Sequence, residues 1–192
     1  MIKSKTPIYL ASKSPRRQKL LKQLNLNFKV LSFEVNEEIK KGETPVRAVK
    51  RLSLEKMEQA KQQLKNGIII TADTIVVLNK EIINKPVDEK DAELILKKLS
   101  GKTHIVYTGF CISNIKKDIT LTDYEKTLVT FRNLNNEEIT AYIKTGSPMD
   151  KAGAYGIQDD FGAVFIKKIN GCYYNVVGLP LTKIYTALQK VT

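Results

Sequence analysis

Residues 8–24 read IYLASKSPRRQKLLKQL, and this stretch sets the first pattern of the fold. The apolar run Ile8 to Ala11 predicts a short buried strand, followed by a turn. Pro15 suits the first position of a helix, where its missing N–H needs no partner, and Ser14 suits the N-cap. Apolar residues then recur at helical spacing, at Leu20, Leu21 and Leu24. The stretch therefore predicts strand, tight turn and helix.

The remaining chain first alternates helices with strands and then turns to antiparallel strand pairs. The expected helices cover residues 45–65, 89–99, 136–144 and 181–188. Their expected caps are Thr44, Asp88 and, in a capping box with Glu138, Asn135. The helix 89–99 is expected to face inward with Ala92, Ile95, Leu96 and Leu99. The expected strands cover residues 28–35, 68–70, 75–78, 81–83, 104–113, 119–131, 164–169 and 172–177, the last two forming a hairpin around Asn170-Gly171. This order predicts an α/β fold with a mixed central sheet flanked by helices. Residues 1–192 would form a single domain, or two lobes of it around a central cleft.

The composition excludes several classes of protein. Hydrophobic residues make up 42% of the chain, enough for a sizeable core, and no apolar run approaches the roughly 18 residues of a membrane span. The first residues lack the apolar centre of a signal peptide. Cys111 and Cys172 match no zinc or redox spacing, so we expect two reduced thiols. These features predict a cytoplasmic protein with no membrane partner.

The chain carries a net charge of +12, which favours anionic partners: nucleic acid, an anionic membrane or phosphorylated small molecules. The first 22 residues contain basic side chains and no acidic ones. The basic residues there are Lys3, Lys5, Lys13, Arg16, Arg17, Lys19 and Lys22.

The start of the first expected helix is a candidate anion site. Free N–H groups and about half a positive charge gather at a helix N-terminus, and arginine forks match phosphate oxygens. Arg16 and Arg17 oppose the helix dipole there, so their placement makes sense if an anion occupies the site. Ser12 and Ser14 add hydroxyl donors. The alternative is a solvated basic turn.

Two acidic positions are candidates for catalysis or metal binding. Asp73 is expected directly after the apolar strand 68–70, at the exposed end of a central strand, where it could bind a metal, act as a base or cap a turn. Glu37 follows the second expected strand and could join Asp73 around Mg²⁺, which prefers oxygen ligands. Taken alone, each residue fits a surface turn better.

The glycine-dense run 151–163 permits close approach of a ligand but has neither P-loop nor dinucleotide-binding spacing, and a plain loop is equally consistent. His104 is expected to be packed rather than catalytic. The sequence shows no serine-triad or Cys/His signal, so covalent catalysis has little support.

Five blocks in order resemble the Maf (septum-formation) family and span nearly the whole chain. They are residues 9–17 (YLASKSPRR), 72–77 (ADTIVV), 98–104 (KLSGKTH), 150–158 (DKAGAYGIQ) and 176–181 (VVGLPL). The resemblance implies a nucleoside triphosphate pyrophosphatase with a mixed α/β fold related to inosine triphosphate pyrophosphatases, a divalent cofactor (Mg²⁺ or Mn²⁺) and a homodimer.

The resemblance also assigns roles to single residues. Asp73 would be the catalytic carboxylate and a metal ligand, and Glu37 the second metal ligand. The positions that match phosphate contacts are Ser12, Arg16, Arg17, Lys56 and Lys85. The positions that match determinants of substrate preference are Arg16, Thr74 and Gln158.

The block 150–158 resembles the family branch that acts on dTTP and UTP. Gln158 offers an amide donor and a carbonyl acceptor, which suits the edge of thymine or uracil. Two alternatives stay open: a modified purine triphosphate such as 7-methyl-GTP as substrate, or a basic nucleic-acid-binding inhibitor of septum formation without catalysis. We expect no nucleic-acid partner, because the chain has no known nucleic-acid-binding signature and no row of aromatic residues for base stacking.

Overall fold

The computed structural model describes residues 2, 4–158 and 161–192. Lys3 of the basic N-terminal segment lies outside the described residues, as do residues 159–160 of the glycine-dense run. The chain divides into two compact units. The first unit comprises Met1–Asp73, Thr108–Glu125 and Gly178–Thr192, and the second comprises Thr74–Tyr107 and Lys126–Val177.

Within the described residues, seven strands form one mixed sheet with the order β2-β1-β3-β5-β6-β7, and β4 pairs with β3. The strands are β1 Ile8–Ala11, β2 Phe28–Leu31, β3 Ile68–Leu78, β4 Glu81–Ile83, β5 Thr103–Asn114, β6 Ile119–Phe131 and β7 Ile166–Asn170. β1 runs parallel to β2 and β3, whereas β4 runs antiparallel to β3 and β7 antiparallel to β6. The predicted α/β class with a mixed sheet is confirmed.

The helices begin at caps that the sequence predicts. They are α1 Pro15–Lys22, α2 Pro45–Gln62, α3 Glu89–Leu99, α4 Asn136–Ile143, α5 Tyr173–Val177 and α6 Leu181–Val191. Short 3₁₀ turns cover Ser147–Asp150, Ala152–Ala154 and Phe161–Phe165. The side chains of Ser14 and Thr44 accept hydrogen bonds from the backbone of the third helical residue, and Asn135 forms a capping box with Glu138.

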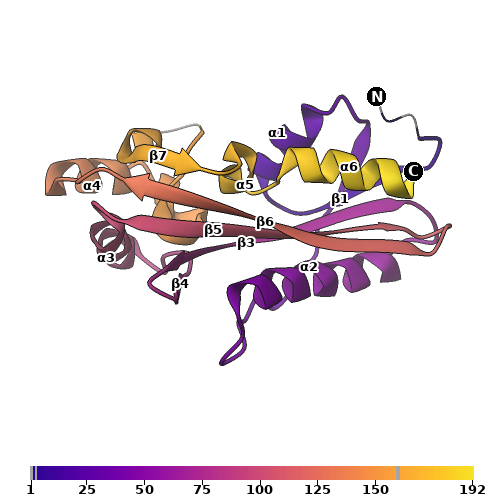
Figure 1. The fold of residues 1–192 in the computed structure, drawn as a ribbon, viewed down its shortest axis with the longest axis horizontal. Helices are drawn as coiled ribbons and strands as arrows, with labels where there is room; N and C mark the ends of the chain where they lie inside the picture. Colours follow the sequence, from indigo (N-terminus) through magenta and orange to yellow (C-terminus); the bar gives the residue numbers. More distant parts are fainter. Residues whose placement is uncertain (1, 3, 159–160) are drawn as a thin grey trace. The chain divides into compact units, whose positions relative to one another are not determined.

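In the first unit, α2 covers one face of the strands, and α1 and α6 cover the opposite face (Figure 1). The backbone of α2 approaches β5 closely, because a Cβ at Gly109 would lie 2.3 Å from the carbonyl oxygen of Val49. Under α2, a buried cluster is formed by Ala11, Met57, Ala60, Ile69 and Cys111. On the opposite face, Asn114 Nδ2 donates to the Val191 carbonyl at 2.7 Å and fixes the end of α6.

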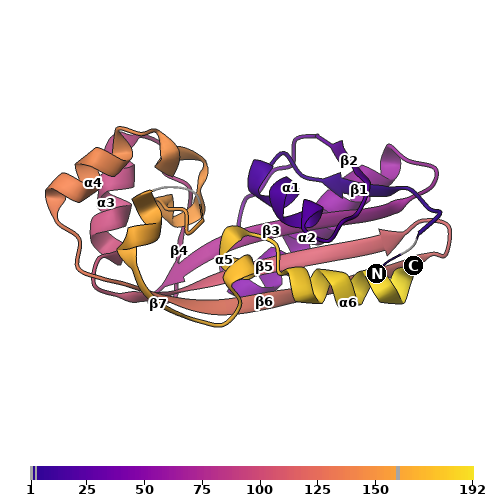
Figure 2. The ribbon, with the colours of Figure 1, turned by 90° about the horizontal axis from the view of Figure 1, so that it is seen from above.

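The second unit has its own core, in which α3 and α4 lie side by side (Figure 2). The predicted inward face of α3 is buried at Ala92, Ile95, Leu96 and Leu99. An aromatic cluster includes His104, whose Nε2 lies 2.8 Å from the hydroxyl of Tyr155. The rings of His104 and Tyr155 both meet Phe131 edge to face. His104 is therefore packed, as predicted, and burial lowers its pKa to about 4.

Three local predictions were wrong. Asp73 does not follow a strand but lies inside β3, which continues from Ile68 to Leu78. Residues 71–74 (TADT) look like a turn because three of the four are polar. The buried Thr71 hydroxyl, however, donates to the Ser53 carbonyl on α2 at 2.7 Å, so it can stay in a central strand without an unsatisfied donor.

The second expected strand ends at Leu31 rather than at residue 35. The expected hairpin at 164–177 is also absent, because residues 173–177 form helix α5 while β7 pairs with β6. The side chain of Asn175 explains the helix: its Nδ2 donates to the Val106 carbonyl at 3.0 Å and to Thr127 Oγ1 at 2.9 Å.

Candidate active site

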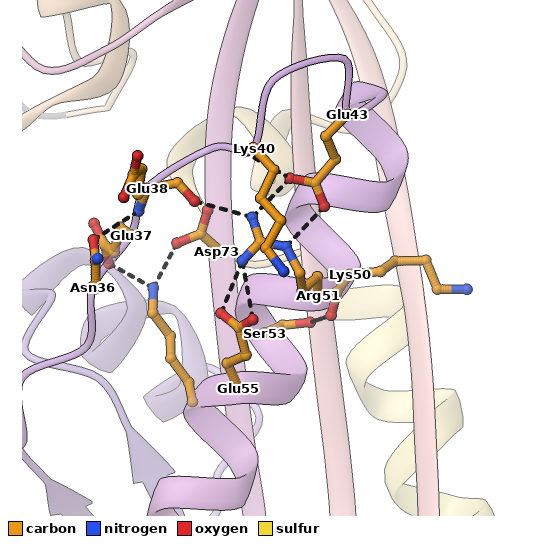
Figure 3. A network of polar contacts seen from close by, with 11 residues as sticks. Asn36, Glu37, Glu38, Lys40, Glu43, Lys50, Arg51, Ser53, Glu55 and Asp73 are labelled. Atoms are coloured by element: carbon orange, nitrogen blue, oxygen red, sulfur yellow. Dashed lines mark hydrogen bonds and ion pairs between the residues drawn. The ribbon is translucent and has the colours of Figure 1, made fainter.

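Two carboxylates in the first unit share one ammonium group. Lys56, on α2, donates from Nζ to Asp73 Oδ1 at 2.5 Å and to Glu37 Oε1 at 2.6 Å. In Figure 3, dashed lines run from the labelled Asp73 and Glu37 to this ammonium, whose side chain carries no label. The side chains of Lys56 and Asp73 are 9% and 8% exposed, whereas that of Glu37 is 45% exposed. Because two carboxylates face one ammonium group, Lys56 alone balances only part of their negative charge.

The position of Asp73 within β3 and its contact with Lys56 hold the carboxylate in place. A nearly buried carboxylate is costly unless a partner compensates the lost hydration, and Lys56 supplies that partner. A side chain on a central strand is also held more rigidly than one on a loop. Successive side chains of a strand point to opposite faces, so Thr71 and Asp73 share the face covered by α2.

The N-terminus of α1 places the second part of the site. Arg17 is half-buried and donates from Nε to the Gly178 carbonyl at 2.8 Å and from Nη1 to Ser12 Oγ at 3.4 Å. Ser12 Oγ also accepts the backbone N–H of Ser14 at 3.2 Å. These contacts fix the guanidinium at the start of the helix.

Electrostatics link Arg17 to the carboxylates. Burial lowers the pKa of Arg17, the negative charges of Asp73 and Glu37 raise it, and the positive charge of Arg16 lowers it again. The structure thus brings together six of the residues singled out in the sequence, all in the first unit: Ser12, Arg16, Arg17, Glu37, Lys56 and Asp73.

The remaining three predicted positions belong to the second unit. Thr74 directly follows Asp73 in β3, and the alternation of the strand points its side chain to the opposite face of the sheet. Lys85 is exposed in the segment after β4, and Gln158 is half-buried in the loop that follows the 3₁₀ turn Ala152–Ala154. Their predicted roles in substrate binding stay predictions.

The oxygen donors present fit a magnesium or manganese ion. The described part of the chain contains no group of three or more His, Cys, Asp and Glu side chains arranged to hold a metal. Mg²⁺ does not require such a cage, since it usually keeps several waters and binds one or two carboxylates together with substrate phosphates. Asp73 and Glu37, which already converge on one cation, would be those carboxylates.

Sequence reasoning did not single out Arg51, which organises the loop that carries Glu37. Its guanidinium bonds to both carboxylate oxygens of Glu43, at 2.8 and 2.7 Å, and to the Glu38 carbonyl at 3.0 Å (Figure 3). It also bonds to both oxygens of Glu55, at 3.0 and 2.9 Å. The one local signal is the Arg51–Glu55 spacing of four residues on a helix, which is a common surface pattern and does not indicate the contacts with the loop.

Comparison with known proteins decides the family. A sequence profile described as "Maf-like protein" matches residues 7–191. The chain belongs to the Maf family. The resemblance inferred from the sequence blocks is therefore confirmed.

Relatives of this Maf protein are similar to it over nearly their whole length. A dTTP/UTP pyrophosphatase of Dictyoglomus thermophilum is 47% identical over 189 residues, which cover 97% of each chain. The dTTP/UTP pyrophosphatase of Syntrophomonas wolfei is 46% identical, with 94% of this chain and 95% of the relative covered. The dTTP/UTP pyrophosphatase of Aquifex aeolicus is also 46% identical, with 96% and 95% covered.

Among solved structures, a nucleoside-triphosphatase / dITP/XTP pyrophosphatase of Mycobacterium abscessus matches with a TM-score of 0.44 and 12% identity, covering 95% of this chain and 94% of that one. A likeness at this level does not bear on the site. Within its described residues, this Maf protein has no helix that is long and apolar enough to cross a membrane.

Proposed function

We propose that this Maf protein hydrolyses dTTP and UTP to the nucleoside monophosphate and pyrophosphate, with Mg²⁺ or Mn²⁺ as cofactor. The observation that carries the proposal is the nearly buried Asp73 carboxylate, paired with Lys56 and electrostatically linked to Arg17. The substrate pair is that of relatives 46–47% identical to this chain. The cytoplasmic location and the homodimer expected from the sequence are part of the proposal.

In the proposed reaction, a water oxygen attacks the α-phosphorus while the bond from that phosphorus to the bridging oxygen breaks. Asp73 orients the water and takes its proton, and pyrophosphate leaves with the electron pair of the broken bond. Lys56 and the arginines at the start of α1 neutralise negative charge on the phosphates, which is usually the largest contribution in such reactions. A bound Mg²⁺ or Mn²⁺ supplies further charge neutralisation on phosphate oxygens.

Choice of base is proposed to depend on Gln158. Thymine and uracil present an acceptor, a donor and an acceptor along one edge, and a side-chain amide with nearby backbone groups can pair with them. Cytosine reverses part of this pattern and would leave buried polar groups unpaired, at a cost of about 1–3 kcal/mol each. The purine alternative, 7-methyl-GTP, would need more room beside the glycine-backed loop 151–156.

A nucleotide panel tests the proposal. Pyrophosphate release from dTTP, UTP, CTP, GTP and 7-methyl-GTP is measured under one Mg²⁺ or Mn²⁺ condition, and kcat/KM is compared. The highest values are expected for dTTP and UTP. If 7-methyl-GTP or CTP came out ahead of both, the substrate assignment would be wrong. If no nucleotide of the panel released pyrophosphate and the protein bound nucleic acid in a salt-sensitive way, the non-catalytic alternative would be supported.

A further inference from the structure

We propose that Arg51 is a positioning residue, which holds the loop between β2 and α2 so that Glu37 points at Lys56 and Asp73. The inference rests on the proposed function in treating Glu37 as a metal ligand. The hydrogen bonds of Arg51 go to Glu43, Glu55 and the Glu38 carbonyl rather than to either proposed ligand. Its effect would therefore pass through the loop.

The loop needs such an anchor because it has no regular structure of its own. No helix or strand occurs between Leu31 and Pro45. Glu37, in the middle of this loop, has a half-exposed side chain, so burial alone does not fix it. Arg51 binds the loop on both sides of its turn, at the Glu38 carbonyl and at the Glu43 carboxylate.

The two cations of α2 hold neighbouring residues of the loop. Lys56 binds the Glu37 carboxylate at 2.6 Å, and Arg51 binds the Glu38 carbonyl at 3.0 Å. At a rise of about 1.5 Å per helical residue, the two cations start about 7.5 Å apart along the helix axis. The loop is thus aligned along α2, and loss of the Arg51 contacts would release the backbone at Glu38, the neighbour of Glu37.

The chemistry of Arg51 suits a permanent anchor. Its side chain is 19% exposed and that of Glu43 is 10% exposed, so solvent screens their contact less than it would an ordinary surface pair. The hydrogen bonds from Arg51 hold the pKa of Glu43 below its usual range, and Glu43 in turn raises the pKa of Arg51. The planar guanidinium serves two carboxylates and a carbonyl at once, a geometry that a lysine ammonium cannot reproduce.

The chain offers a matched control in the second unit. Arg132 donates to both carboxylate oxygens of Glu138, at 2.9 and 2.6 Å, and to the Val164 and Asn133 carbonyls at 2.7 and 3.0 Å. Like Arg51, Arg132 therefore binds a carboxylate and backbone carbonyls with one guanidinium, but it anchors the start of α4. Loss of Arg132 would remove a similar number of bonds without touching the loop that carries Glu37.

The test measures Mn²⁺ binding directly, by the electron paramagnetic resonance signal of free Mn²⁺, for the full-length chain without nucleotide. Arg51→Gln is expected to weaken Mn²⁺ binding by about tenfold or more, as is common for residues that orient metal ligands. Arg51→Lys should weaken it less than Arg51→Gln. Arg132→Gln should lower the melting temperature and leave Mn²⁺ affinity unchanged.

A double-mutant cycle separates positioning from general stability. If Arg51 acts through Glu37, Arg51→Gln has no further effect on Mn²⁺ affinity in a Glu37→Gln background. An equal loss in both backgrounds, an unchanged affinity in folded Arg51→Gln or Arg51→Lys, or a wild-type chain that binds no Mn²⁺ would overturn the inference. Because no nucleotide is present, failure of dTTP or UTP hydrolysis would be seen separately.

Discussion

The ammonium of Lys56 lies 2.5 Å from Oδ1 of Asp73, and both side chains are nearly buried. The pair joins helix α2 to the middle of the central strand β3. Glycine at position 109 lets the α2 backbone come close to the neighbouring strand β5. The proposed catalytic carboxylate is therefore placed by the packing of a helix on a sheet, and only the second carboxylate, Glu37, depends on a loop.

Asp73→Asn removes the proposed base and metal ligand while keeping the shape of the side chain. We expect kcat for dTTP to fall by about 100-fold or more, since positioned acid–base groups contribute about 10²–10⁴-fold. The fold should survive, because Lys56 keeps its contact with Glu37. Asp123→Asn is the control, since Asp123 pairs with Lys183 on the surface of the first unit. A folded Asp73→Asn variant with near-normal turnover would contradict the assignment.

Arg17→Ala tests the anion site at the start of α1. Loss of a charged donor to phosphate is expected to lower kcat/KM by about 10–100-fold, equivalent to roughly 1.5–3 kcal/mol, with only a modest stability loss from the missing bond to the Gly178 carbonyl. Arg47→Ala is a matched control, because exposed Arg47 occupies the same third position of a proline-started helix capped by Thr44. A large stability loss with intact kinetics for Arg17→Ala would return this residue to a structural role.

Gly109→Ala tests the close approach of α2 to β5. The added methyl group would collide with the Val49 carbonyl, so we expect a loss of about 1–3 kcal/mol in the free energy of unfolding and reduced turnover as Lys56 shifts. Gly146→Ala adds a methyl group in open space at a positive φ, so it should cost some stability without changing kcat. Equal stability and turnover for Gly109→Ala and the wild type would show that the helix does not rest on this contact.

The buried His104 should make the free energy of unfolding depend on pH. Burial lowers its pKa from 6.5 to about 4, so between these values the unfolded chain binds a proton that the folded chain does not. Stability should therefore fall as the pH drops from 6.5 to 4, by up to about 3 kcal/mol from this residue. Thermal unfolding of His104→Gln, which retains a hydrogen-bonding side chain for Tyr155, should show a flatter profile over this range. Identical profiles for the variant and the wild type would contradict this origin.

The sequence predicted the features that depend on local chemistry. Ser14 and Thr44 as caps, the capping box at Asn135 and the apolar face of α3 were all found, because caps and helical periodicity act within a few residues. The mixed sheet also followed, from the order of the elements.

The sequence did not predict features that depend on distant contacts. Asp73 was expected in a turn because the acceptor that satisfies the Thr71 hydroxyl within the strand, the Ser53 carbonyl, lies 18 residues away in the sequence. Asn175 was expected in a strand because its partners, Val106 and Thr127, are more distant still. Arg51 was not noticed because its role depends on a loop whose path no periodicity describes.

The most direct test of the account is hydrolysis of dTTP in H₂¹⁸O, after which the products are separated and their ¹⁸O content is measured by mass spectrometry. Attack of water on the α-phosphorus predicts dTMP that carries one ¹⁸O atom and pyrophosphate that carries none. Label in pyrophosphate with unlabelled dTMP would place the attack on the β-phosphorus. Formation of dTDP and inorganic phosphate would contradict the proposed pyrophosphatase reaction altogether.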